Sequence, residues 1–191
     1  MRFSQRSGLK GMHATLSPSQ PAWMNYDPDK MMAVVAAQQA AQRGTELHAF
    51  AAEAIRLGIV QEDTGQTLNS YINDAIGFRM TPEQVLFWSE NAFGTADAID
   101  DRDMFLRIHD LKTGLTESPF QQLKGYAALY CLEYNQNPMK LNGLELRIYQ
   151  SDEIKVVSHK THPDLADEIH HVMEHIKLLD GIISKMKVEG I

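Results

Sequence analysis

Two aspartates and a lysine lie within residues 94 to 126 at a spacing that could support metal-dependent chemistry on a phosphate. The run FLRIHDL combines β-branched, aromatic and aliphatic residues and is followed by the breaker Thr113-Gly114, so a strand is predicted here. Because strand side chains alternate between faces, Asp110 and Lys112 should point the same way. A carboxylate can bind magnesium, and a nearby ammonium can neutralise a phosphate or orient an attacking water.

A second carboxylate is expected from the segment before this strand. Asp97 lies on a short apolar run after Gly94, where the backbone can bend or be approached closely, and residues 100 to 103 form a polar turn. These features predict an antiparallel hairpin that brings Asp97 beside Asp110. The candidate catalytic residues are therefore Asp97, Asp110 and Lys112.

The sequence after Gly114 predicts a helix with Ser118 as its cap and Pro119 at its first position. Gln122 and Tyr126 are four residues apart and lie on one face of this helix. An amide and a phenol so placed can hydrogen-bond a phosphate, or a lysine beside a metal.

An alanine-rich region beginning at Asp27-Pro28 predicts a long helix that ends near Gly58. The pattern leaves open whether Gly44 splits this helix into two. Four residues recur at helical spacing and are predicted to pack on a sheet: Leu47, Phe50, Ala54 and Leu57. His48 taken alone indicates only an ordinary polar residue.

Four short motifs, in order along the chain, together resemble the PD-(D/E)XK nuclease superfamily. They are Gly44-x-x-x-His48, Gly94-x-x-Asp97, Asp110-x-Lys112 and Gln122-x-x-x-Tyr126. The resemblance is to the branch that contains RecB-type nuclease domains, CRISPR-associated single-strand exonucleases and bacteriophage recombination exonucleases. It covers roughly residues 40 to 160. Each motif is weak alone, and their shared order makes the signal specific.

The resemblance implies a restriction-endonuclease-like α/β core and a metal site. The implied ligands of Mg²⁺, for which Mn²⁺ can substitute, are His48, Asp97, Asp110 and the backbone carbonyl of Leu111. Lys112 would orient the attacking water, while Gln122 and Tyr126 would position the DNA backbone. Three acidic residues are candidates for supporting roles around the site, although solvent exposure explains them almost as well: Glu46, Glu53 and Glu90.

By the same resemblance, the expected function is a DNA exonuclease that processes ends for recombination, repair or viral replication. An endonuclease of the same fold is one alternative, and a non-catalytic DNA-binding or assembly module is another. A third alternative treats Asp97, Asp110 and Lys112 as a surface ion pair on a hairpin, which leaves the four ordered motifs unexplained. Expected partners are DNA, a single-strand annealing or recombination protein of a bacteriophage, and further copies of the chain, but not a membrane.

Composition limits the alternatives. The chain has 191 residues and a net charge of −7, so DNA contacts must use local basic patches. Its one cysteine, Cys131, cannot form an internal disulfide or supply an iron–sulfur cluster, which several relatives of the branch carry. The sequence has no long apolar run and no signal-peptide core at its N-terminus, which predicts a soluble protein of the cytoplasm, or of the host cytoplasm if viral.

The remaining sequence predicts an irregular, basic N-terminal arm over residues 1 to 27 and one nuclease domain over residues 28 to 191. The fold class is α/β, with a central mixed sheet flanked by helices. Its strands are predicted over residues 84 to 91, 93 to 99, 104 to 111, 144 to 150 and 153 to 159. The C-terminal segment predicts an amphipathic helix with His171 and His175 on its solvent side. Its packed apolar stripe is predicted to consist of Ile169, Val172, Met173, Ile176, Leu179 and Ile183.

Overall fold

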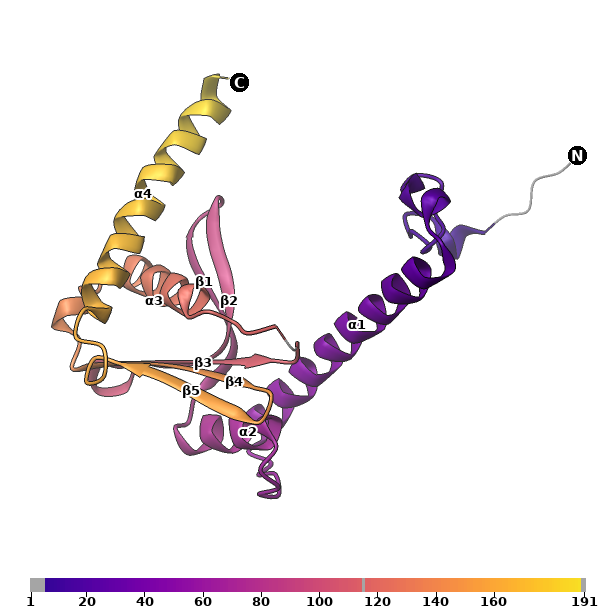
Figure 1. Cartoon of the computed structure of the whole chain (residues 1–191). Coiled ribbons are helices and arrows are strands. Elements are labelled where there is room, and N and C mark those ends of the chain that lie inside the picture. Colours follow the sequence, from indigo (N-terminus) through magenta and orange to yellow (C-terminus); the bar gives the residue numbers. More distant parts are fainter. Residues whose placement is uncertain (1–5, 115, 190–191) are drawn as a thin grey trace, which may run out of the picture. The chain divides into compact units, whose positions relative to one another are not determined.

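The computed structural model describes residues 6–114 and 116–189 (Figure 1). Met1–Arg43 and Gly44–Ile191 form two compact units, considered separately below. The first contains two short 3-10 helices, Ser7–Leu9 and Pro21–Asn25, and otherwise irregular chain up to Asp27. The indole N–H of Trp23 donates to the carbonyl of Ser17 at 2.9 Å, which ties the end of this segment. Residues 1–5 of the predicted arm lie outside the described residues.

Helix α1 spans Pro28–Leu57. Asp27 starts it, because its side chain accepts a hydrogen bond from the backbone N–H of Lys30 at 2.7 Å. Gly58 ends it with a φ of +65° that suits glycine, and the N–H of Ile59 then donates back to Ala54. Both predicted ends are confirmed, and the helix continues through Gly44 without a break.

The second unit is built on a five-stranded mixed sheet in the order β1-β2-β3-β4-β5. Strands β3 and β4 are parallel and all other neighbours are antiparallel. The strands are β1 (Thr81–Ser89), β2 (Ala92–Asp100), β3 (Phe105–Lys112), β4 (Gly143–Gln150) and β5 (Glu153–Ser158). The predicted α/β class, with a mixed sheet flanked by helices, is confirmed.

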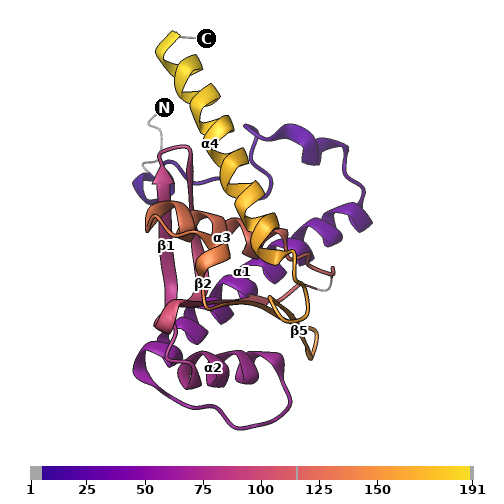
Figure 2. The same cartoon turned by 90° about the vertical axis from the view of Figure 1, so that its left-hand side faces the viewer.

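Helices cover both faces of the sheet (Figures 1 and 2). One face packs against α3 (Gln121–Glu133) and the first half of α4 (Leu165–Glu189), around a core that includes Leu106, Ile108 and Leu146. The other packs against α2 (Thr67–Gly77) and the end of α1, around Leu111 and Tyr149. Alternate residues of β3 therefore enter different cores, as the period of a strand requires.

The predicted start of α3 is wrong. The helix begins at Gln121 after Phe120, and Ser118 does not cap it. The backbone N–H of Ser118 instead donates to the side-chain oxygen of Gln150 on β4. The side-chain NH2 of Gln150 in turn donates to the backbone carbonyls of Gly114 and Thr116. These tertiary hydrogen bonds hold the segment before α3 in an irregular conformation.

Two predicted helix faces pack differently from expectation. On α1 the residues against the sheet are the small ones and Ile55, whereas Leu47, Phe50 and Leu57 are exposed. On α4, Ile169 and Met173 are buried, but the later stripe residues Leu179 and Ile183 are exposed. His171 and His175 are exposed as predicted. Among the described helices, none has the length and apolar character needed to cross a membrane.

Candidate metal-binding and catalytic site

The hairpin of β2 and β3 brings Asp97 beside Asp110. Ala98 pairs with His109 and Ile99 with Ile108, and this antiparallel register leads directly to the two aspartates. The side chain of Asp97 then accepts a hydrogen bond of 2.9 Å from the backbone N–H of Leu111. The predicted hairpin is therefore confirmed.

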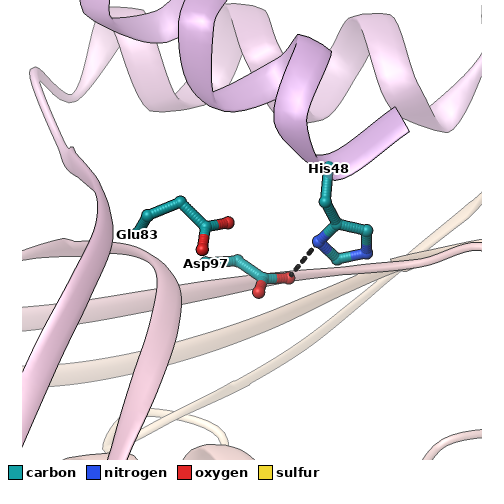
Figure 3. A group of neighbouring side chains, drawn as sticks. All are labelled: His48, Glu83 and Asp97. Atoms are coloured by element: carbon teal, nitrogen blue, oxygen red, sulfur yellow. Dashed lines mark ion pairs between the residues drawn. The ribbon is translucent and has the colours of Figure 1, made fainter. Parts of the chain in front are cut away.

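His48 reaches this hairpin from α1. Its Nδ1 atom lies 3.4 Å from Oδ2 of Asp97, as the dashed line in Figure 3 shows. Gly44, one turn earlier, is buried, and a Cβ atom there would lie only 2.8 Å from Oγ1 of Thr113. Glycine thus lets α1 approach the end of β3 closely, which gives a physical reason for the Gly-x-x-x-His spacing.

Glu83 on β1 completes a group with His48 and Asp97. One ligand atom from each of the three residues lies within 4.8 Å of the other two. The residues on either side, Pro82 and Gln84, pair with Ala98 and Ala96, so Glu83 stands opposite Asp97 (Figure 3). Glu83 is not among the residues predicted from the sequence, because the predicted strand begins one residue later, at residue 84. We refer to His48, Glu83 and Asp97 as the acidic group.

A second set of polar contacts lies on the α3 face of the sheet. The ammonium of Lys112 is 2.9 Å from Oδ2 of Asp110 and donates to Oε1 of Gln122 at 2.7 Å. The Gln122 amide donates in turn to the Tyr126 hydroxyl at 2.9 Å. The Tyr126 ring packs on Gly94, where a Cβ atom would lie 3.0 Å from Cε1. We call Asp110, Lys112, Gln122 and Tyr126 the lysine relay.

Asp110 is buried, with only 1% of its surface exposed, so the pair with Lys112 is not a surface ion pair. Its Oδ1 atom has no hydrogen-bond donor among the described residues. Burial, together with the charge of Asp97, raises the pKa of Asp110 from 3.8 to about 6, against the opposing effect of Lys112. The Asp110 carboxylate is therefore incompletely compensated.

The acidic group also shows uncompensated charge. The hydrogen bond with Asp97 raises the pKa of His48, despite its partial burial. Partial burial and then the charge of Asp97 raise the pKa of Glu83. Each shift records negative charge concentrated around Asp97. A bound cation would relieve this repulsion, so the residues present fit a divalent metal.

The donor atoms of the acidic group indicate which metals it could hold. Two carboxylates suit hard ions such as Mg²⁺ and Mn²⁺, and the imidazole widens the range to transition metals. Asp110 lies alongside this group and pairs with Lys112, while its charge also acts on His48. The structure thus adds Glu83 to His48 and Asp97, and coordination of a metal by the predicted set of His48, Asp97 and Asp110 stays a prediction.

Other predicted residues lie elsewhere. Glu90 is exposed in the turn between β1 and β2, seven residues along the chain from Glu83, so the structure does not bring it to the group. Glu46 and Glu53 are exposed on α1, and Glu53 is 3.8 Å from Arg56. Leu111 reaches Asp97 through its N–H, while coordination through its carbonyl stays a prediction.

Searches against protein-family models, curated sequences and solved structures find no significant match to this chain. The function of this chain must therefore be inferred from the geometry of the site and the order of the motifs.

Proposed function

We propose that this protein is a metal-dependent DNA nuclease of the PD-(D/E)XK superfamily. One observation carries the proposal: motif residues from α1, β2, β3 and α3 meet as the acidic group and the lysine relay around a single hairpin. A chance set of motifs would not be expected to converge in this way. The presence of both Asp110 and Lys112 also favours a catalytic protein over a module that only binds DNA.

The acidic group, with the charge of Asp110 beside it, would hold Mg²⁺ or Mn²⁺. A cation bound there would lower the pKa of a water and offset the charge of the scissile phosphate. Lys112 is 24% exposed, and its hydrogen bonds to Asp110 and Gln122 hold its ammonium in place. That ammonium would stabilise the charge that develops on the phosphate or orient the attacking water.

The finer features of the proposal rest on the resemblance. We propose an exonuclease that acts on DNA ends during recombination, repair or viral replication in the cytoplasm. It would work with a single-strand annealing or recombination protein, or as a homo-oligomer. The hydrogen bonds from Lys112 to Gln122 and from Gln122 to Tyr126 favour contact of the lysine relay with the DNA backbone, because an amide and a hydroxyl can both donate to phosphate oxygens.

Digestion of end-labelled linear duplex and of closed circular DNA with Mg²⁺ tests the proposal. The linear duplex should be degraded and the circle should survive, and EDTA should stop the reaction. Asp97→Asn should abolish cleavage, whereas Asp152→Asn should not, because Asp152 lies in the β4–β5 turn with a positive φ that asparagine tolerates. Cleavage of the circle would indicate an endonuclease. DNA binding without cleavage of either substrate would indicate a non-catalytic module.

A further inference from the structure

The hairpin of β1 and β2 carries an ordered row of cross-strand pairs on one face. Glu83 stands opposite Asp97, then Val85 pairs with Thr95, and Phe87 with Phe93. Strand alternation puts the side chains of these residues other than Glu83 on one side of the hairpin. Glu83 has a φ of +52°, which interrupts the alternation, and its side chain is placed on this side by its position beside His48 and Asp97. The opposite side, with Leu86, Gly94 and Ala96, packs against α3. The row therefore runs from the acidic group toward the tip of the hairpin on the face away from α3.

The outer part of this row is exposed and aromatic. Phe87 is 48% exposed and Phe93 is 62% exposed, and their rings stack with centroids 6.4 Å apart and an interplanar angle of 29°. Val85, between the phenylalanines and the acidic group, is also 51% exposed. Two large apolar rings at the surface have a free-energy cost in water unless a ligand covers them, so this face is a candidate contact surface.

The hairpin extends beyond the rest of the sheet. Among the residues that the structure describes, β2 pairs with β3 only through Ala98, Ile99 and Asp100, so its first six residues have no partner strand on that side. Figures 1 and 2 show β1 and β2 projecting past β3, with α3 against them. The hairpin therefore presents Phe87 and Phe93 on a projecting arm whose base carries Glu83 and Asp97.

We propose that Phe87 and Phe93 form a stacking platform for unpaired nucleobases of the DNA strand that is cleaved at the acidic group. This inference rests on the proposed nuclease function and names the part of the substrate that the site would select. Four residues separate Glu83 from Phe87, or about 13 Å along a strand. That length corresponds to about four steps of stacked B-DNA, or to fewer steps of an extended single strand. A strand with one phosphate at the acidic group could thus reach the platform with a nearby base.

Unpaired bases fit the platform better than a duplex does. A phenyl ring has no charge and no hydrogen-bond donor, so it cannot contact phosphates or read base edges in a groove. It can stack on the face of a base, and only an unpaired or terminal base exposes that face. The net charge of −7 gives no general attraction for the DNA backbone, which increases the contribution expected from stacking.

Binding of labelled DNA by the full chain in EDTA, followed by fluorescence anisotropy, tests the platform apart from cleavage. The probes are a blunt duplex and the same duplex with a single-stranded overhang on either strand. The wild-type protein should prefer an overhang. Phe87→Ala/Phe93→Ala should weaken overhang binding by about ten- to hundredfold, the size expected for lost base–aromatic stacking, with little change for the blunt duplex. Phe87→Tyr/Phe93→Tyr should bind normally.

Two further variants separate stacking from other uses of this face. Phe87→Leu/Phe93→Leu keeps apolar surface but removes the rings, so it should lose the overhang preference as the alanine pair does. Ile154→Ala/Val156→Ala, exposed on β5, is the matched control and should change nothing. Melting temperatures check that each variant folds.

Three results would overturn the platform. The first is normal overhang binding by Phe87→Ala/Phe93→Ala, and the second is normal overhang binding by Phe87→Leu/Phe93→Leu. The third is a variant that changes its oligomeric state but keeps the preference for an overhang, which would show that this face binds a second copy of the chain. If the wild-type protein neither binds nor cleaves DNA, the proposed function fails as well. Metal-dependent cleavage without an overhang preference overturns the platform alone.

Discussion

The two aspartates of the β2–β3 hairpin lie beside each other but have different partners. Asp97 shares its surroundings with His48 and Glu83, where a second carboxylate adds to the negative charge. Asp110 is fully buried and has an ammonium 2.9 Å away that is itself hydrogen-bonded to Gln122. Asp97 belongs to a group whose charge a bound cation would offset, whereas the charge of Asp110 is offset in part by Lys112.

This difference assigns separate tasks to the two aspartates. A group of ligands for an exchangeable metal must stay accessible and keep net negative charge, and the acidic group has both properties. A lysine that acts on a reacting phosphate must be held at one position, and the buried Asp110 and the amide of Gln122 provide two fixed acceptors for it. Each substitution below changes either the acidic group or the lysine relay and leaves the residues of the other set unchanged.

Removal of the Lys112 ammonium should have the largest effect. Lys112→Ala should lower the single-turnover rate of DNA cleavage by at least about a hundredfold, a typical loss for one electrostatic stabiliser, while metal binding persists. Lys112→Arg should also fail, because a broad planar guanidinium does not replace a compact ammonium. Melting temperatures are measured in parallel. A near-normal rate, or a loss that only follows unfolding, would remove Lys112 from the chemical step.

Neutralisation of Asp110 should stabilise the fold while it impairs catalysis. Its pKa lies above the value in the unfolded chain, so the wild-type protein loses stability as the pH rises from about 4 to about 6 and bears the full cost above that range. Asp110→Asn should therefore raise the free energy of unfolding by about 3 kcal/mol at pH 8 and by little at pH 4. Denaturant unfolding in EDTA at both pH values measures this, with Asp152→Asn as control. An equal gain at both values would contradict the role of charge.

Loss of the Glu83 carboxylate should weaken metal binding. Glu83→Gln is expected to lower the affinity for Mn²⁺ about tenfold or more, a size typical of changes around a metal site. Titration calorimetry measures the affinity, and Glu90→Gln, a change of the same kind in the turn of the same hairpin, should have no effect. Equal affinities for the two variants would show that Glu83 is not a ligand.

Removal of one acceptor from Lys112 should have the smallest effect. Gln122→Ala should lower kcat/KM about fivefold, in line with a net hydrogen-bond contribution of about 1 kcal/mol. Gln121→Ala, on the exposed neighbouring residue of α3, is the matched control. An effect as large as that of Lys112→Ala would mean that Gln122 contributes more than one hydrogen bond.

Local patterns in the sequence predicted most of the fold. Apolar alternation and turn residues predicted all five strands to within a few residues, and Asp27 and Gly58 marked both ends of α1. The spacing of Asp110 and Lys112 predicted their shared face, and the spacing of Gln122 and Tyr126 predicted that they lie on one face of α3. These features depend on residues that are close in the chain, whose geometry the strand and helix periods determine.

Contacts between distant segments could not be predicted in the same way. Gln150 is far along the chain from Ser118, yet its side chain decides how α3 begins. The large residues of α1 point away from the sheet because Gly44 and the alanines allow a closer approach than leucine or phenylalanine would. Each outcome depends on which surfaces pack together in the folded chain. Helical periodicity shows which residues share a face of a helix, but it does not show what that face packs against.

The identity of the third member of the acidic group illustrates the limit most clearly. A two-residue turn at Glu90-Asn91 sets the pair Ser89 and Ala92, and an unbroken ladder from there would place Gln84 opposite Asp97. A register shift between Phe87 and Ser89 leaves Trp88 as an extra residue, so Glu83 stands there instead. The sequence by itself determined the two strands, their turn and the aspartate. Only tertiary packing decided the bulge. A one-residue shift moves the side chains of a strand to the opposite face, so the free energy of the shift depends on what each face then contacts.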